Sequence, residues 1–101
     1  MANRIELLQD VHVLARQHPQ YRLIQEDVID SLWLYVLAGC DPGSFLQAVL
    51  RRDLEAVALA DEQNRDTIYE IWLYVYNELP GNCWGSRNRV AAWISQENEN
   101  R

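Results

Sequence analysis

The strongest constraint on this chain is an internal repeat. Residues 27–36 read DVIDSLWLYV and residues 66–75 read DTIYEIWLYV, so six of the ten positions are identical and Trp-Leu-Tyr-Val is unbroken in both copies. A Pro-Gly and a Gly-Ser follow each copy. Repeats of this kind are supersecondary units that bury their apolar faces against each other. The sequence therefore predicts two related helix–turn–helix halves, at about residues 27–52 and 66–95.

Apolar spacing predicts an all-α fold, a compact bundle of five or six helices. Apolar residues recur at helical intervals, and no stretch alternates apolar and polar residues as a strand does. The expected helices cover residues 4–17, 23–38, 44–52, 53–62, 65–79 and 86–95, and the third and fourth of these are either separate or joined through a kink. Ser44 and Ser86 are the expected N-caps of their helices. We expect one domain over residues 1–95 and a disordered tail at 96–101.

The repeat also predicts how the two longest apolar helices meet. The equivalent apolar positions are Ile29 and Ile68, Leu32 and Ile71, Trp33 and Trp72, and Val36 and Val75. Each set covers a broad arc of its helix, which is typical of a helix packed on several sides. We expect the two helices to pack together about an approximate twofold axis.

Composition excludes some classes of function. Fifteen acidic residues against nine basic ones give a net charge of −6, which disfavours direct binding to nucleic acid because that needs a basic face. No apolar run approaches the roughly 20 residues that cross a bilayer, and the first residues do not resemble a signal peptide. We therefore expect a cytoplasmic protein, with Cys40 and Cys83 as reduced thiols. No spacing of a metal site, cofactor site or catalytic motif is present, so we predict no metal, no cofactor and no enzymatic activity.

One candidate site is a small-ligand site at the helix N-termini. Free backbone N–H groups and the positive end of the helix dipole attract anions, and arginines beside them add bidentate contacts. The candidate residues for a phosphorylated or nucleotide-like ligand are Ser44, Asn82, Trp84, Ser86, Arg87 and Arg89. The alternative is purely structural, with both serines as ordinary caps and Trp84 as a lid over the core.

A second candidate is a surface that binds a partner protein. Acidic clusters occupy basic grooves on partners, and aromatic side chains outside the core stripes form association surfaces. The candidate residues are Glu26, Asp30, Tyr35, Asp61, Glu62 and Tyr74. The alternatives are a solvated acidic face that keeps the protein soluble and an aromatic interface between two copies of the chain.

The last two-thirds of the chain resemble a family. Residues 42–86 are similar to the pattern PGSFLxAVLxxDLxxAxxxAD, followed by Tyr-Asn-Glu-x-Pro and Cys-x-Gly-Ser. The positions that carry the likeness are 42–46, 48–50, 53–54, 60–61, 76–78, 80, 83 and 85–86. This pattern resembles small, largely uncharacterised proteins of bacteriophages and prophages. Many of them have Asn where this chain has Arg52.

The resemblance implies an accessory protein of a mobile element that acts stoichiometrically in the host cytoplasm. Such proteins block a host protein, for example one used in defence, or sequester a nucleotide signal. Occlusion of a host protein is the leading hypothesis for this chain. Capture of a small phosphorylated ligand at the helix N-termini is the alternative.

Overall fold

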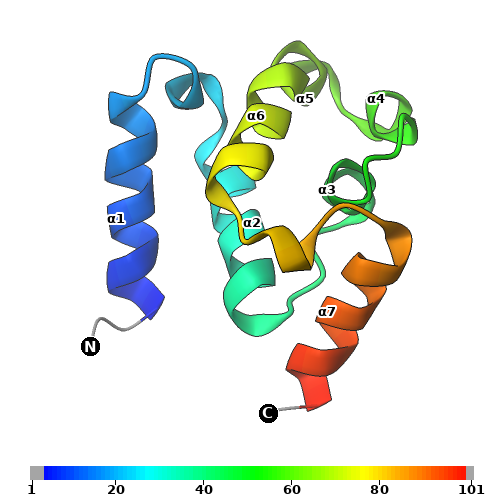
Figure 1. The fold of residues 1–101 in the computed structure, drawn as a ribbon. Coiled ribbons are helices and arrows are strands. Elements are labelled where there is room, and N and C mark those ends of the chain that lie inside the picture. Colours follow the sequence, from blue (N-terminus) through cyan, green and yellow to red (C-terminus); the bar gives the residue numbers. More distant parts are fainter. Residues whose placement is uncertain (1–3, 100–101) are drawn as a thin grey trace.

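The computed structural model describes residues 4–99, and it describes side chains from residue 10 to residue 95. The elements are α1 (Arg4–Gln17), the 3₁₀ turn η1 (Tyr21–Leu23), α2 (Glu26–Ala38), α3 (Ser44–Leu50), α4 (Glu55–Leu59), α5 (Glu62–Asp66), α6 (Ile68–Glu78), the 3₁₀ turn η2 (Gly81–Cys83) and α7 (Arg87–Glu99) (Figure 1). No strand occurs in residues 4–99, so the predicted all-α class is confirmed.

Residues 4–99 form seven α-helices, which is more than the five or six expected. α3 and α4 are separate helices, as one of the two predicted alternatives has it, and the additional helix is α5. Arg52 adopts a left-handed backbone, φ 62°, and separates α3 from α4. Thr67 leaves helical geometry at φ −113° and ψ 17°, and separates α5 from α6. α7 continues to Glu99, into the tail predicted to be disordered, and residues 100–101 lie outside the described residues.

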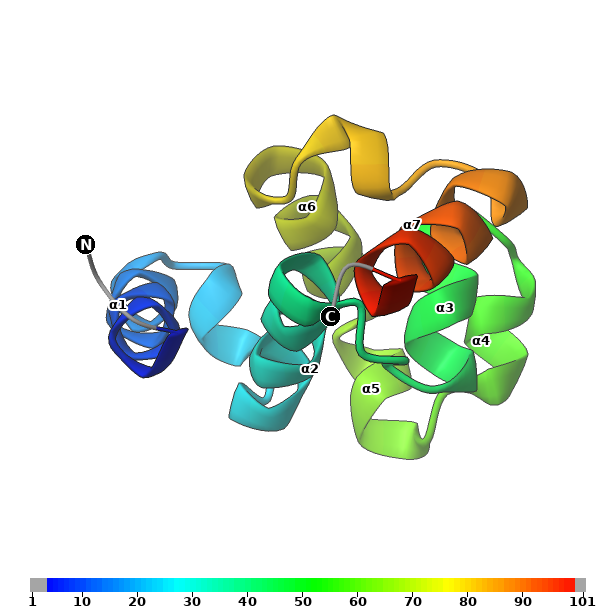
Figure 2. The ribbon, with the colours of Figure 1, turned by 90° about the horizontal axis from the view of Figure 1, so that it is seen from below.

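Helix α2 lies in the middle of the molecule. Seen from below, α1 lies on one side of α2, and the crossed pair of α3 and α7 lies on the other (Figure 2). Six of its thirteen residues are buried, which confirms the broad apolar arc expected of a central helix. Gly39 ends α2 in the left-handed conformation, φ 67°, as a C-cap glycine does.

The two copies of the repeat bury equivalent residues. Leu32 and Ile71 are both fully buried, and so are Tyr35 and Tyr74, at 0 and 3% exposure. The tryptophans of the two copies are both partly buried against the core. The indole Nε1 of Trp33 donates a hydrogen bond to the hydroxyl of Tyr74 over 2.7 Å, which joins α2 to α6. The repeat therefore fixes which side of each helix faces the core, and the approximate twofold axis stays a prediction.

Tyr35 and Tyr74 correct the prediction of an aromatic partner surface, because both belong to the core. Burial of a tyrosine is tolerable when its hydroxyl has a partner. The hydroxyl of Tyr35 donates to the carbonyl of Cys83 over 2.6 Å, and the hydroxyl of Tyr74 accepts from Trp33. The polar ends of both side chains are therefore satisfied inside the protein.

The segment after α6 is held down by backbone groups of α2 and α3. The indole Nε1 of Trp93 donates to the carbonyl of Tyr35 over 2.9 Å, and the backbone N–H of Gly85 donates to the carbonyl of Leu50 over 2.7 Å. The start of α7 consequently lies at the C-terminal end of α3, which positions the loop between η2 and α7 for the site described below.

Replacing Tyr35 by Phe tests the importance of the buried hydroxyl. The Y35F variant leaves the carbonyl of Cys83 without this donor in a dry environment, which costs about 1–3 kcal/mol of unfolding free energy. Urea denaturation measures the loss. The matched control is Y69F, because Tyr69 is 62% exposed and its change is expected to stay within about 0.5 kcal/mol. Equal stability of the two variants would contradict the assigned role.

The buried thiol and phenols predict that the fold weakens at alkaline pH. Burial raises the pKa of Cys83 to about 11 from its ordinary 9.0, and burial also raises the pKa values of Tyr21, Tyr35 and Tyr74. Above pH 9 the unfolded chain loses these protons before the folded chain does, so the unfolding free energy falls as pH rises toward 11. Urea titrations on both sides of this range measure the slope, and C83A should reduce it. A flat profile would show that these groups titrate alike in both states.

Candidate binding site

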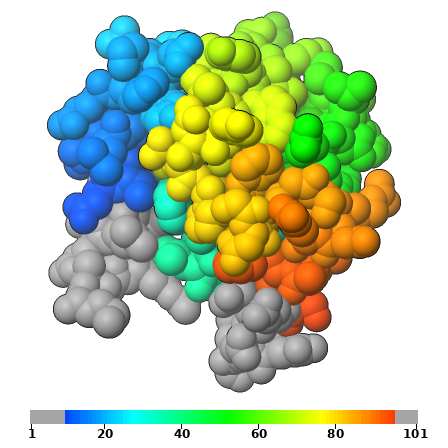
Figure 3. Space-filling model, viewed as in Figure 1, coloured from blue at the N-terminus to red at the C-terminus, as the bar shows by residue number. Residues whose placement is uncertain are grey.

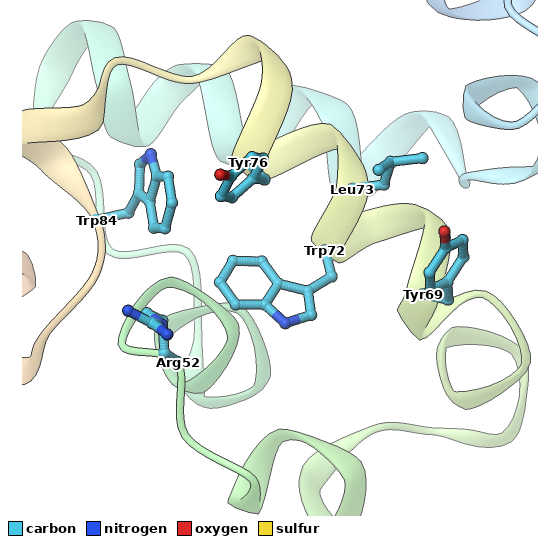
Figure 4. A pocket seen from close by; sticks show the side chains of 6 residues that line it. All are labelled: Arg52, Tyr69, Trp72, Leu73, Tyr76 and Trp84. Atoms are coloured by element: carbon cyan, nitrogen blue, oxygen red, sulfur yellow. The ribbon is translucent and has the colours of Figure 1, made fainter.

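One face of α6 carries an exposed row of aromatic side chains. Tyr69, Trp72 and Tyr76 are spaced at i, i+3 and i+7, which places them on one side of the helix. Trp84 comes from the loop after η2 and joins them. Trp72, Tyr76 and Trp84 gather around one hollow, and Arg52 lies across it from α6 (Figure 4). In the space-filling view, α6, η2 and the start of α7 form the middle of this face, in yellow and orange (Figure 3).

The rings of Trp72 and Trp84 meet edge to face, and those of Tyr76 and Trp84 are tilted. The Trp72 and Trp84 rings are 5.6 Å apart at 80°, and the Tyr76 and Trp84 rings are 5.7 Å apart at 56°. These are favourable arrangements of aromatic pairs. They leave Tyr69 and Tyr76 more than 60% exposed, so much of the aromatic surface faces solvent.

Two adjoining hollows make up what we call the aromatic groove. The first has a volume of about 500 Å³ and is lined by Arg52, Tyr69, Trp72, Leu73, Tyr76 and Trp84. The second has a volume of about 280 Å³ and is lined by Val49, Arg52, Asp53, Leu54, Ala56, Val57, Ile68, Tyr69 and Trp72. Arg52, Tyr69 and Trp72 line both hollows. The groove also carries exposed aliphatic surface, since Leu54 is 89% exposed.

The tryptophans of the two copies have different partners. In an exact twofold arrangement, the bond from Trp33 to Tyr74 would have a mate from Trp72 to Tyr35. The hydroxyl of Tyr35 instead donates to the carbonyl of Cys83. Trp72 lines the groove and contacts Trp84, a residue of the loop after η2. The groove therefore arises where the two copies differ.

Arg52 reaches the groove from a strained backbone position. Its φ of 62° lies in the left-handed region, where glycine and asparagine are tolerated best. Its side chain is exposed and makes no hydrogen bond or ion pair with any residue that the structure describes. The neighbouring Asp53 lies 3.9 Å from Arg51 and 3.7 Å from Arg87, so it is shared by two other guanidinium groups.

The predicted ligand residues near α7 are occupied by contacts within the chain. Ser86 accepts a hydrogen bond from the backbone N–H of Arg89, so it is an N-cap as predicted. The guanidinium of Arg89 donates to the carbonyls of Gly81 and Trp84 over 3.2 and 3.5 Å. Asn82 is exposed within η2. These residues form a tight turn whose groups mainly bond to each other.

Ser44 lies apart from the other predicted ligand residues. The start of α7 is bonded to Leu50 at the far end of α3, which is about 9 Å along the helix from Ser44. Ser44 is also the first residue of α3 rather than its cap. Gly43 is the N-cap, and it has no side chain to cap with. The nearby carboxylate of Asp41 accepts from the side-chain amide of Gln47 and from the N–H of Gly43, and these bonds hold the pKa of its carboxyl below the usual value. The two Gly-Ser sites therefore do not form one site.

The acidic residues that were predicted to bind a partner have different structural roles. Glu26 pairs with Arg16, and Asp30 accepts from His12 over 2.6 Å, so both fasten α1 to α2. Asp61 caps α5 by accepting from the N–H of Asn64. Of the four acids, Glu62 alone makes no side-chain hydrogen bond or ion pair with the part of the chain that the structure describes.

Sequence reasoning missed Arg52, Tyr69, Trp72 and Tyr76 as site residues. A comparison of the two copies contains the signal. The positions of Tyr69, Trp72 and Tyr76 correspond to Asp30, Trp33 and Leu37 in the first copy, so two of the three have become tyrosine. Exposed tyrosines at positions that the other copy fills with an acid and an aliphatic residue indicate a surface with its own role.

Comparison of the chain with models of protein families, with curated proteins and with solved structures finds no match. Within the described residues, no helix has the length and apolar character needed to cross a membrane. The same residues contain no group of His, Cys, Asp or Glu side chains arranged to hold a metal ion.

The two arginines of the first turn of α7 have different expected roles. R89A removes the donor to two carbonyls of the turn and should cost about 1 kcal/mol of unfolding free energy. R87A removes a 73% exposed guanidinium with a long ion pair and should cost less than about 0.5 kcal/mol. Thermal or urea unfolding compares the two variants. A larger loss in R87A than in R89A would contradict these assignments.

Proposed function

We propose that this protein is a non-enzymatic binding protein that acts stoichiometrically by holding a segment of a partner protein in its aromatic groove. The occupied partner is a host protein, for example one used in defence, and the chain is of the phage or prophage type. The mobile-element setting rests on the sequence resemblance at residues 42–86. The groove as binding surface rests on the geometry of α6 and the loop after η2.

The observation that carries the proposal is the exposed aromatic row on α6. Aromatic residues and Arg are enriched at the centres of protein interfaces, where truncating one such side chain often costs more than 1 kcal/mol of binding free energy. The groove contains two Trp, two Tyr and Arg52. Contiguous apolar surface of this kind on a small protein indicates an interaction site.

The occupant that fits is an apolar segment with negative charge. The rings and aliphatic side chains of both hollows take apolar groups. Arg52 adds a guanidinium with no partner in the described chain, whereas Asp53, the acid in the lining, is shared by Arg51 and Arg87. A guanidinium in such surroundings favours a planar anion such as a carboxylate.

The small-ligand alternative is supported less by the geometry. Arg89 and Ser86 are bonded within their own turn, and Ser44 lies at the other end of α3. The first hollow is nevertheless large enough for an aromatic base, since ligand pockets range from about 300 to 1,000 Å³. A thermal-shift panel of nucleotides distinguishes this alternative from a protein partner.

Y76A is the variant that tests the groove. Tyr76 is 68% exposed and contacts Trp84, so its removal should lower partner affinity about tenfold while the unfolding free energy changes by less than about 1 kcal/mol. Capture from host lysate on the immobilised protein, followed by quantification of the recovered partner, measures the effect.

The matched control is L23A, because Leu23 is 54% exposed on η1 and does not line the groove. L23A should recover the partner as the parent chain does. A partner recovered equally by Y76A and L23A would show that the contact lies elsewhere. Stabilisation by a nucleotide that is lost in Y76A would favour the small-ligand alternative instead.

A further inference from the structure

Helix α1 shows how the first copy of the repeat is covered. Val11 and Ala15 of α1 are buried, at 9 and 2% exposure, and a small hollow between α1 and α2 is lined by both of them and by Trp33. His12 contacts Asp30 at 2.6 Å, and Arg16 pairs with Glu26. The face of α2 that contains Asp30 and Trp33 is therefore covered by an amphipathic helix with basic residues at its edge.

The aromatic groove is the same face in the second copy. Tyr69 and Trp72 of α6 occupy the repeat positions of Asp30 and Trp33. In the described part of the chain, the residues across this face come from the α3–α4 segment and from Trp84, and they leave two hollows and a Tyr69 that is 62% exposed. The duplication thus leaves one covered face and one open face of related shape.

The open face lacks the two acids that pair with α1 on the covered face. The position of Asp30 has become Tyr69, and the position of Glu26 has become Arg65. Arg65 itself donates to the carbonyls of Val57 and Ala60, so it is already used within the chain. Arg52 supplies an unengaged guanidinium at the junction of the two hollows. A helix that covers the open face must therefore carry acidic residues at the positions where α1 carries His12 and Arg16.

The left-handed backbone of Arg52 indicates that its side chain has a function. Residues held in sparsely populated conformations persist where the surrounding structure or the function requires them. At φ 62°, glycine or asparagine would cost less than arginine. The long side chain extends from this turn into the hollow opposite α6 (Figure 4).

We infer that the groove receives an amphipathic helix of the partner protein, which lies along α6 as α1 lies along α2 and presents a carboxylate to Arg52. This inference rests on the proposed function and specifies the occupant. Helix-in-groove binding uses apolar anchors one turn apart, and Val11 and Ala15 show that spacing on α1. Each of the two hollows receives one apolar anchor of the partner helix. The guanidinium of Arg52, which lies between the hollows, pairs with the carboxylate of that helix. A second copy of the chain is a poor occupant of the groove. Its α1 would place the basic residues His12 and Arg16 next to the guanidinium of Arg52.

Peptides based on α1 provide the test. The acidic probe is the blocked peptide of residues 4–17 carrying His12→Glu and Arg16→Glu, and the neutral probe carries His12→Gln and Arg16→Gln. NMR of the tryptophan indole N–H groups reports binding in the full chain. Trp72 and Trp84 lie in the groove, whereas the indoles of Trp33 and Trp93 are hydrogen-bonded inside and serve as references.

We expect the acidic peptide to shift the Trp72 and Trp84 signals and to bind about tenfold more tightly than the neutral peptide, which corresponds to 1.4 kcal/mol. R52N should abolish this difference without loss of fold, because asparagine tolerates the left-handed backbone. R22N is the matched control, since Arg22 is an exposed arginine on η1 outside the groove, and it should retain the difference.

Other results would overturn the inference in distinguishable ways. Equal affinity for the two peptides would contradict a contact between Arg52 and a carboxylate. A preference for the acidic peptide that persists in R52N would contradict it too. Shifts confined to Trp33 would show that the peptide replaces α1 instead of occupying the groove. Shifts of Trp72 and Trp84 by AMP and by neither peptide would assign the groove to a phosphorylated ligand. Peptides that fail while the captured partner still depends on Tyr76 would reject the helix and leave the proposed function standing.

Discussion

The hydroxyl group of Tyr35 donates a hydrogen bond to the carbonyl of Cys83 over 2.6 Å, inside the core and away from water. In a medium of low dielectric constant such a bond is strong, and an unmade one is costly. The bond holds η2 over α2, and the carbonyl of the same tyrosine accepts from Trp93 of α7. Tyr35 therefore fixes the position of η2 and of the loop that places Trp84 beside α6.

The same bond breaks the symmetry of the duplicated halves. Tyr74 keeps the tryptophan of the other copy as its donor, but Tyr35 is engaged with the η2 turn. Trp72 makes no such bond to Tyr35, and it contacts Trp84 instead while both remain partly buried against the core. A duplication first supplies two similar folding units. Divergence at a few positions then turns one of them into a surface while the other remains covered by α1.

The sequence predicts the core of this fold better than its connections. Periodic apolar residues placed α1 at residues 4–17, and the repeat correctly paired Leu32 with Ile71 in the core. The sequence left open whether the helices on either side of Arg52 separate or join, and it did not predict the break at Thr67, because a left-handed or bridging residue has no apolar signature. Tyr35 and Tyr74 were assigned to a partner surface, although both are buried in the core. Helical periodicity alone does not say that a tyrosine will find a buried acceptor such as the carbonyl of Cys83.

The candidate site depended even more on tertiary contacts. Ser86 was correctly predicted as a cap, yet the partners of Arg89 come from a turn whose shape the sequence does not specify. The acids at positions 26 and 30 looked free on their own helix and are engaged by α1. Arg52 joins Tyr69 and Trp72 only because the α3–α4 link folds back toward α6.

The way in which α1 is attached has a consequence for the dynamics of the chain. Two polar pairs and the buried side chains of Val11 and Ala15 hold α1 to α2, whereas α2, α6 and α7 are joined by partly buried hydrogen bonds and by the fully buried side chains of Leu32, Ile71 and Val90. Elements with few buried contacts open at lower free energy than the global fold. Amide hydrogens of α1 should therefore exchange with solvent by local opening, well before those of α2 and α6. Each such opening exposes the covered face of the first copy and briefly gives the molecule two uncovered faces of related shape.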